Sequence, residues 1–367
     1  MDESNLRVES RGSALIITLN RPQKLNALTK NMCLALTAAV RGADPSRHRV
    51  IVLRGAGERA FCAGGDIREM SENLHAAEEF LFAEYNTDYA IATSKIPIVS
   101  LMHGITMGGG IGLGSHAQVR VVTPDITMAM PETRIGIIPD VGINRILASS
   151  QPGFGEIAAA VSASFGARAA LDNDFADFAV AAADHDALTQ ALSNISEDQT
   201  PQDIVREFAL QKEELTRDPL AELAADLAPA LQSETLLNLP GGPLEALQHL
   251  FELLKSAKSE YGKNLAVQAA EVCPFTAAVA LWRVVQNRSK QLTPLTALGS
   301  DLIVLFRLVA RADFREGVRA RIIDKDNSPQ WSALSDTQTV EQQVAAALTS
   351  DLNAHEQAVF ANWLEDK

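Results

Sequence analysis

Short apolar runs recur along the first half of the chain. They are rich in β-branched residues and bounded by Gly, Pro or polar residues, a pattern typical of buried β-strands. The runs cover residues 14–20, 50–53, 96–102, 119–123 and 126–131. Segments with apolar positions at helical spacing lie between them, so the pattern predicts an α/β architecture.

Three segments of this first half are predicted to be helices. Thr29 is a residue type that caps helix N-termini, and apolar residues follow it at every fourth position up to Val40. Residues 71–93 carry apolar side chains at helical spacing, and residues 110–117 follow a glycine-rich turn. Strands that alternate with short helices again favour the α/β class.

The pattern changes at about residue 195. The remaining chain is rich in Ala, Leu, Glu and Gln at helical spacing, with Pro and Gly at the breaks. Its clearest predicted helices are residues 244–257, 274–287 and 300–312. We therefore expect two parts: an α/β core over residues 1–195 and an α-helical C-terminal region over residues 196–367.

Two of the predicted strands run into glycine-rich turns that precede helices. Strand 96–102 is followed by consecutive glycines at 108–110, and strand 50–53 leads to Gly64 and Gly65. Glycine lets a ligand atom approach the backbone, and the first N–H groups of a helix have no internal acceptor. Two such N–H groups aimed at one point would form an oxyanion hole, which acyl chemistry uses to stabilise a developing negative charge.

Two carboxylates, Glu132 and Asp140, lie in an otherwise apolar segment bounded by Pro and Gly. Desolvation raises the pKa of such acids and suits them to acid–base or nucleophilic chemistry. The alternative is that both are ordinary turn or capping acids. The nearby glycine turns favour the chemical interpretation for Glu132 and leave both interpretations open for Asp140.

Composition and charge limit the kinds of molecule that this protein is expected to bind. The chain has 32 Lys and Arg against 46 Asp and Glu, a net charge of -14, which argues against sequence-independent binding of nucleic acid. The three cysteines, Cys33, Cys62 and Cys273, lack disulfide or metal-site spacing and are expected to be reduced thiols in a cytoplasmic protein. No apolar run approaches the length of a membrane span, and the N-terminus lacks the pattern of a targeting peptide.

Residues 61–66, with the triple glycine about 40 residues later, resemble the crotonase (enoyl-CoA hydratase/isomerase) superfamily. The resemblance implies a core of β-β-α turns arranged as a spiral over about residues 8–195. It also implies an acyl-CoA substrate whose thioester oxygen is bound by the N–H groups of Gly65 and Gly109. No metal or separate cofactor is expected, because CoA is part of the substrate.

The pattern of acids resembles two branches of this superfamily rather than its ordinary hydratases. Hydratases usually carry a second acid three residues after the central glycine, where this chain has Gly112. Glu132 matches the acid that hydratases keep. An Asp at the position of Asp140 is typical of 3-hydroxyisobutyryl-CoA hydrolases and dienoyl-CoA isomerases.

Residues 103–110, 130–142 and 313–331 closely resemble the hydrolase branch, so the expected activity is hydrolysis of a short 3-hydroxyacyl-CoA thioester in valine breakdown. In that activity Glu132 is expected to act as nucleophile or general base, and Asp140 to orient the substrate hydroxyl or assist proton transfer. An isomerase or hydratase, and a CoA-binding protein without catalysis, are the alternatives. Whether the chain forms a homo-oligomer is left open.

The resemblance also implies further substrate-binding residues. Glu84 matches a glutamate that lines the site from the preceding helix, although it could instead be a solvated helix acid. Lys24 is expected near the phosphate or adenine part of CoA, and Ala63 and Asp66 are expected among the residues that bind the substrate. Residues 143–180 depart from the branch and leave the identity of the acyl group open.

Overall fold

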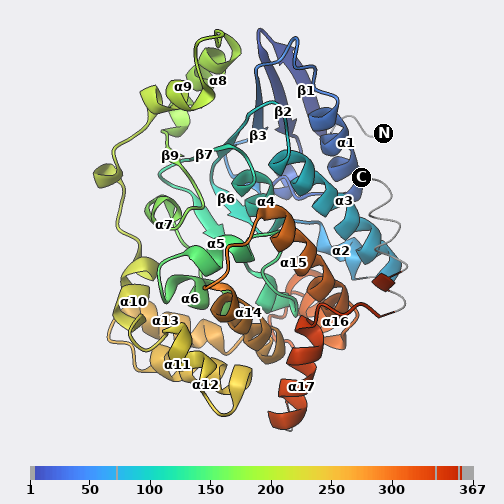
Figure 1. Cartoon of the computed structure of the whole chain (residues 1–367), viewed down its shortest axis with the longest axis vertical. Coiled ribbons are helices and arrows are strands. Elements are labelled where there is room, and N and C mark those ends of the chain that lie inside the picture. The colour runs from blue at the N-terminus through green and yellow to red at the C-terminus, as the bar shows by residue number, and fades with distance from the viewer. Residues whose placement is uncertain (1–4, 72, 335–336, 354–355, 358–367) are drawn as a thin grey trace.

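Figure 1 shows the computed structural model of the chain, which describes residues 5–71, 73–334, 337–353 and 356–357. A six-stranded sheet has the order β1-β2-β3-β5-β7-β9, and only the β1–β2 pair is antiparallel. Its strands are β1 (Leu6–Arg11), β2 (Ala14–Leu19), β3 (Val50–Gly55), β5 (Ile98–Met102), β7 (Val119–Val122) and β9 (Phe178–Ala179). Most of the C-terminal helices lie below the sheets in this view.

A second, three-stranded parallel sheet has the order β4-β6-β8. Its strands are β4 (Ala60–Cys62), β6 (Ile105–Met107) and β8 (Thr127–Ala129). Each follows a strand of the large sheet and precedes a helical turn, namely α2 (Ile67–Met70), α4 (Gly109–Ser115) and the 3₁₀ turn η2 (Glu132–Ile135). These successive β-β-α units confirm the predicted α/β spiral.

The inner strands of the large sheet are mostly apolar because both faces of the sheet are covered there. In β2, Ile17 packs in a cluster with residues of α1 (Lys30–Arg41) and α3 (Leu74–Ala92). The neighbouring Ile16 points to the opposite face, where α8 (His185–Ser193) and α9 (Pro201–Phe208) cover it. Full burial of one such side chain contributes about 1.5–3 kcal/mol.

Helix boundaries follow their caps. Thr29 accepts a hydrogen bond from the Met32 N–H, as predicted for the start of α1. Helix α3 begins at Leu74 rather than at residue 71, because Asn73 accepts from the Ala76 N–H and so caps it. Helix α14 (Pro274–Asn287) has the predicted bounds.

Several sequence predictions were wrong in detail. The expected helix 300–312 is two helices, α15 (Pro294–Val309) and α16 (Ala312–Val318). Helix α15 starts earlier than expected because Thr293 caps it. Strand β1 was missed because five of its six residues are not buried, so it carries no apolar run. Strands β4 and β6 are only three residues long and lie inside segments interpreted as turns.

The C-terminal region is helical, as predicted. Its other helices are α10 (Pro219–Leu227), α11 (Ser233–Leu237), α12 (Gly242–Lys255), α13 (Glu260–Ala269) and α17 (Thr337–Leu348). One hydrophobic cluster joins this region to the core, and the division at residue 195 stays a prediction. Within the described residues, no helix is both long and apolar enough to cross a bilayer.

Candidate active site

The first glycine turn is held by a single residue of the preceding loop. The Leu28 N–H donates to the Gly64 carbonyl at 2.8 Å, and the Asp66 N–H donates to the Leu28 carbonyl at 2.7 Å. Because both neighbours of Gly65 bond to Leu28, the Gly65 N–H points away from it. Among the described residues, no acceptor for this N–H is present.

The second glycine turn lies directly beside the first. Gly108 has φ +51° and precedes α4, so Gly109 is the first helical residue and its N–H has no acceptor within the helix. A Cβ on Gly64 would lie only 3.6 Å from the Gly109 nitrogen. The two turns that the sequence placed far apart are therefore in contact, and each offers an N–H group.

Helix α3 covers both glycines with side chains one helical turn apart. A Cβ on Gly65 would lie 2.7 Å from the Phe80 ring, and a Cβ on Gly109 would collide with Glu84 Oε1. Glu84 is only 4% exposed, so the alternative of a solvated helix acid is wrong for it. Because glycine has no side chain, Phe80 and Glu84 can occupy the space directly beside Gly65 and Gly109.

The predicted acids are brought together around this point. Glu132 Oε1 lies against Gly108, where a Cβ would come within 2.7 Å of it. Glu132 is 6% exposed and Asp140 is 5% exposed. Burial raises the pKa of Glu132 and of Glu84 well above the usual range, and the Asp140 charge raises both further. Burial also raises the pKa of Asp140, to about 7.

Tyr85 is a site residue that the sequence interpretation missed. Its hydroxyl donates to Asp140 Oδ2 at 2.8 Å and accepts from the Val141 N–H at 3.2 Å. The hydrogen bond partly opposes the effect of burial on the Asp140 pKa. Tyr85 follows Glu84 directly on α3, but its aromatic ring fits an ordinary helix core position, so no local signal identified it.

Asp88 was also missed, although its spacing carries a signal. It lies one turn after Glu84 on α3, is fully buried, and neither carboxyl oxygen has a hydrogen-bond partner among the described residues. A Cβ on Gly112 would lie 3.3 Å from Asp88 Oδ1 and 2.8 Å from the Val141 side chain. Glycines three residues apart on α4 thus face acids four residues apart on α3, and position 112 has no room for the second acid of hydratases.

The expected CoA-binding residues lie together along the rim of Gly65. Lys24 is exposed at the end of the 3₁₀ turn Pro22–Lys24. The next residue, Leu25, accepts from the Ala63 N–H at 3.0 Å, and Arg21 pairs with Asp66 at 3.2 Å. The loop before α1 and the first glycine turn therefore form one continuous surface.

Other candidate residues have structural roles. Cys62 is buried, and burial raises its pKa to about 12, so it is a neutral thiol rather than a nucleophile. His103 Nε2 bonds to the Gly57 carbonyl and His116 Nε2 to the Val141 carbonyl, each at 2.8 Å. In the described ranges, no group of three or more His, Cys, Asp or Glu could hold a metal ion.

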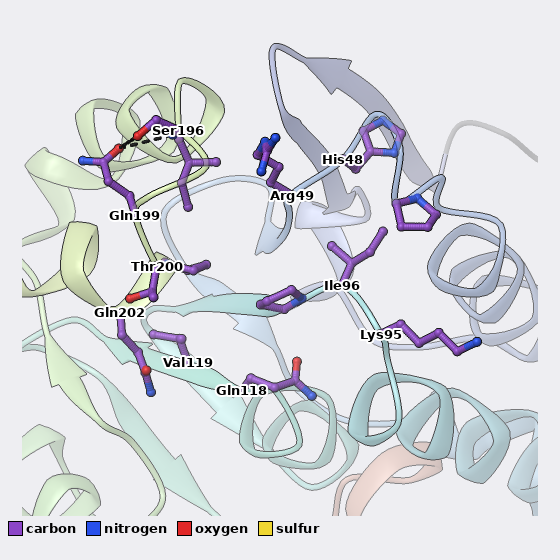
Figure 2. A pocket seen from close by; sticks show the side chains of 14 residues that line it. His48, Arg49, Lys95, Ile96, Gln118, Val119, Ser196, Gln199, Thr200 and Gln202 are labelled. Atoms are coloured by element: carbon purple, nitrogen blue, oxygen red, sulfur yellow. Dashed lines mark hydrogen bonds between the residues drawn. The ribbon is translucent and has the colours of Figure 1, made fainter.

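Figure 2 shows a separate cavity of about 510 Å³ at the end of the large sheet where the parallel strands begin, away from the glycine turns. Arg49, Ile96 and Val119 line it at the amino ends of β3, β5 and β7. Ligands of parallel sheets bind outside the carboxyl ends of the strands. The glycine turns and acids follow those carboxyl ends, so the Figure 2 cavity is not part of this site.

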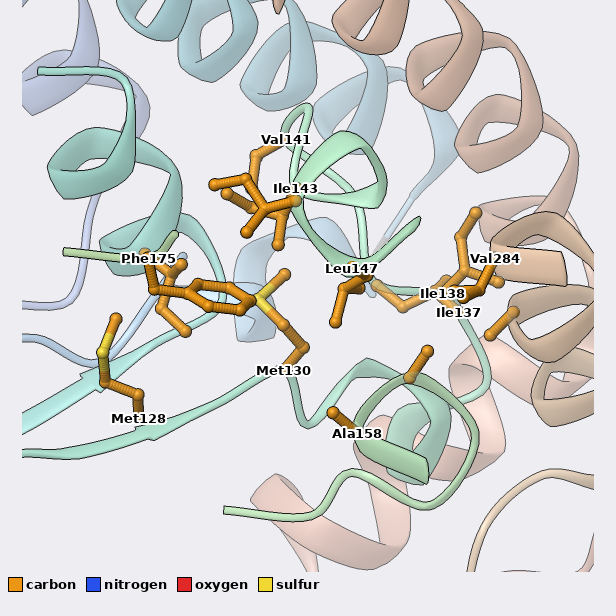
Figure 3. Packing of buried hydrophobic residues seen from close by; sticks show 14 of the residues in the cluster. Met128, Met130, Ile137, Ile138, Val141, Ile143, Leu147, Ala158, Phe175 and Val284 are labelled. Carbon is orange, nitrogen blue, oxygen red and sulfur yellow. The ribbon is translucent and has the colours of Figure 1, made fainter. Parts of the chain in front are cut away.

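The segment that departs from the resemblance packs behind Asp140. It forms α5 (Asn144–Ser149), α6 (Phe154–Val161) and α7 (Ala167–Asp172). Figure 3 shows Ile143 near Val141, with Leu147 between Met130 and Ile138. Both Ile143 and Leu147 are completely buried. The unusual sequence therefore builds an apolar wall adjoining the acids.

The β-β-α spiral, with buried acids at two touching glycine turns, defines a protein of the crotonase class. The family model described as enoyl-CoA hydratase/isomerase matches residues 14–348. The chain belongs to the enoyl-CoA hydratase/isomerase family.

Curated relatives are similar over most of their length. The mitochondrial 3-hydroxyisobutyryl-CoA hydrolase of Bos taurus is 32% identical, over 88% of this chain and 83% of the relative. The mitochondrial 3-hydroxyisobutyryl-CoA hydrolase of Dictyostelium discoideum is 31% identical, over 88% of this chain and 86% of the relative.

Solved structures share the fold over nearly the whole chain. An enoyl-CoA hydratase from Rhodobacter sphaeroides aligns with a TM-score of 0.80 and 31% identity, covering 94% of this chain and 97% of that one. A carnitinyl-CoA dehydratase from Mycobacterium thermoresistibile aligns with a TM-score of 0.81 and 28% identity, covering 95% and 97%. The C-terminal helices are thus included in the shared fold.

Proposed function

We propose that this protein hydrolyses the thioester of 3-hydroxyisobutyryl-CoA or a similar short 3-hydroxyacyl-CoA. The observation that carries the proposal is the joint burial of Glu132, which lies against Gly108, and of Asp140, whose charge acts on Glu132, with glycine at position 112. The curated hydrolases of Bos taurus and Dictyostelium discoideum, similar over 88% of the chain, support the same activity. By this similarity the reaction belongs to valine breakdown.

The N–H groups of Gly65 and Gly109 bind the thioester oxygen and stabilise its negative charge after attack. The part of the chain that the structure describes offers no other acceptor to either N–H, which supports this role, because a preorganised donor is free to bond the oxyanion. One such donor typically contributes about 10²–10³ in rate. CoA is part of the substrate, and the reaction needs no further cofactor.

Glu132 acts in one of two ways that the site leaves open. As a nucleophile it attacks the carbonyl carbon, expels CoA and forms an acyl-enzyme anhydride that water then cleaves. As a general base it removes a proton from water, and the resulting hydroxide attacks the carbonyl. In both routes one water is consumed, the C–S bond breaks and the thiolate gains a proton. The raised pKa of Glu132 means that its carboxylate, once ionised, is a stronger base than that of an exposed glutamate.

Asp140 supplies a proton or binds the substrate hydroxyl. Because burial raises its pKa to about 7, both its protonated and its ionised form are populated near neutral pH. The protonated acid donates to the departing thiolate or to the hydroxyl of the acyl group. Glu84 supports the same site from α3.

The CoA moiety lies along the surface formed by Lys24, Ala63 and Asp66. The cationic Lys24 suits a phosphate group, although the chain as a whole is acidic. The partner is therefore a small molecule rather than nucleic acid or a membrane. We assign the protein to the cytoplasm on its widely spaced thiols; the Bos taurus relative is named as mitochondrial, and cell fractionation decides between the compartments.

An enoyl-CoA hydratase or isomerase is the second candidate, since a structure titled enoyl-CoA hydratase aligns with a TM-score of 0.80. A panel of acyl-CoAs separates the candidates when free thiol and enoyl absorbance are recorded together. A hydrolase releases thiol from 3-hydroxyisobutyryl-CoA without an absorbance change from a new double bond. Absorbance change without thiol would establish the second candidate, and no change in either signal would indicate a CoA-binding protein without catalysis.

A further inference from the structure

The backbone directly after Asp140 adopts a conformation that is costly for its sequence. Val141 has φ +47° although it is β-branched, and Gly142 follows with φ +76°. A non-glycine residue in this region costs about 1–3 kcal/mol and persists only where the surroundings hold it. The turn that orients Asp140 must therefore be fixed by other contacts.

Three contacts from different helices fix this turn. The Val141 N–H donates to Tyr85 of α3 at 3.2 Å, and the Val141 carbonyl bonds to His116 Nε2 after α4 at 2.8 Å. The Gly142 N–H donates to Asp301 Oδ2 of α15 at 2.8 Å. The third contact is the one that reaches the turn from the C-terminal helical region.

Asp301 belongs to a buried ion pair in that region. It is 0% exposed and pairs with Arg283 of α14, which also donates to Ser300 Oγ at 3.1 Å. Burial of both charges costs several kcal/mol in desolvation, so such pairs often contribute little net stability. The hydrogen bond to Gly142 gives this pair a role besides stability.

We propose that the Asp301–Arg283 pair is a positioning device that holds the Gly142 N–H and thereby aligns Asp140 with Glu132 and the two glycine N–H groups. The proposal rests on the proposed role of Asp140 in thioester hydrolysis. Neither residue of the pair touches the substrate. The C-terminal region thus helps to assemble the site of the core.

Both charges of the pair also act on the proton affinity of Asp140, in opposite directions. Burial is the largest influence and raises the Asp140 pKa, the Tyr85 hydrogen bond lowers it, the Asp301 charge raises it and the Arg283 charge lowers it. The remaining titratable groups around the site are Glu84 and Asp88 on α3, Glu132 on η2 and His116 after α4. Loss of the Asp301 charge therefore lowers the Asp140 pKa, because Arg283 stays charged.

Two variants distinguish the effect of the pair on the alignment of Asp140 from the effect of the Asp301 charge on its pKa. Asp301→Asn keeps an oxygen that accepts from Gly142 but removes the charge. The double variant Arg283→Met with Asp301→Leu removes both charges and the acceptor; apolar replacement of a buried pair is often tolerated by the fold. We expect the double variant to lose at least about tenfold in kcat with KM nearly unchanged, since slight misplacement of a reacting group costs up to ~10²-fold.

For Asp301→Asn we expect kcat near the wild-type value at the optimum, with the pH profile shifted to lower pH. A ¹³C NMR titration of the Asp140 carboxyl, assigned with Asp140→Asn, reports the same shift without any activity. Glu156→Gln is the matched control: Glu156 is fully buried, pairs with Arg288 and accepts from the Gly153 N–H at 3.0 Å, but its charge is not among the main influences on the Asp140 pKa. It is expected to change neither kcat nor the titration.

A folded double variant with wild-type kcat, or an unchanged Asp140 titration in Asp301→Asn, would overturn the proposal. If the double variant does not fold, Asp301→Ala, which removes the same acceptor, tests the alignment by the same kcat and KM measurements. If the wild-type protein releases no thiol, the proposed function fails, and the titration still tests the link from Asp301 to Asp140. The two failures are therefore distinguishable.

Discussion

Glu132 lies against Gly108 with its carboxylate almost out of contact with water, so its chemistry depends on the protein rather than on solvent. Replacing it with Gln keeps its shape but removes the group that attacks or accepts a proton. We expect Glu132→Gln to lose at least about two orders of magnitude in kcat, since acid–base catalysis is typically worth ~10²–10⁴. Steady-state kinetics and acyl-CoA binding measure this, and turnover within about threefold of wild type would refute the role.

Asp88 makes the stability of the fold depend on pH. Burial and the charge of Glu84 raise its pKa well above the ordinary 3.8, so the folded chain holds this proton more tightly than the unfolded chain. The resulting stabilisation is complete below the unfolded pKa and is lost as pH rises towards the folded pKa. Asp88→Asn removes the titration, so its stability relative to wild type should grow as pH rises from about 4 to 7.

Thermal unfolding of both proteins at several pH values measures this difference. Asp226→Asn is a suitable control, because Asp226 is exposed on α10. If the difference between the melting temperatures of wild type and Asp88→Asn stays constant over the whole pH range, the pKa of Asp88 is not raised by folding.

At the scale of elements, the site depends on how closely α4 approaches its neighbours. Gly109 lies against Glu84, and Gly110 lies against the Cys62 backbone, so side chains at either position would force the turns apart. The same closeness places the N-terminal end of α4, with its partial positive charge, beside the first glycine turn. Helix α4 is therefore the element that joins the two halves of the oxyanion hole.

We expect Gly109→Pro to abolish activity and Gly109→Ala to reduce it less. Proline removes the N–H itself, while its ring is tolerated at the first position of a helix. Alanine keeps the N–H but displaces Glu84. Circular dichroism establishes folding, and Gly299→Ala in α15, where a Cβ meets nothing within 4 Å, controls for glycine replacement. A folded and active proline variant would exclude the Gly109 N–H as a donor.

At the scale of the whole molecule, the sequence predicted those parts of the fold that have a local pattern. Buried strands such as β2 and β5 were recognised because both sheet faces are covered and their sequences are apolar throughout. The exposed edge strand β1 and the short β4 and β6 carry no such pattern. Helix α14 was placed correctly because Pro274 marks its first position.

For the candidate site too, the sequence predicted some residues and not others. Glu132, Asp140 and the glycine turns stand in recognisable segments, so sequence reasoning found them, although their catalytic roles stay predictions. Asp301 contacts Gly142 across 159 positions of the chain, and no local pattern indicates such a contact. Residues that act through tertiary contacts become visible only when the helices have been placed in space.

The central claim is that this chain hydrolyses a short 3-hydroxyacyl-CoA thioester. The most direct measurement incubates the wild-type protein with 3-hydroxyisobutyryl-CoA and quantifies both products, free CoA by thiol reagent and the free acid by NMR. We expect equal amounts of CoA and 3-hydroxyisobutyrate, with kcat/KM higher than for isobutyryl-CoA, because a site built to bind a hydroxyl discriminates against an analogue that lacks it. Intact thioester after many enzyme equivalents, with a methacrylyl-CoA double bond formed instead, would contradict the claim.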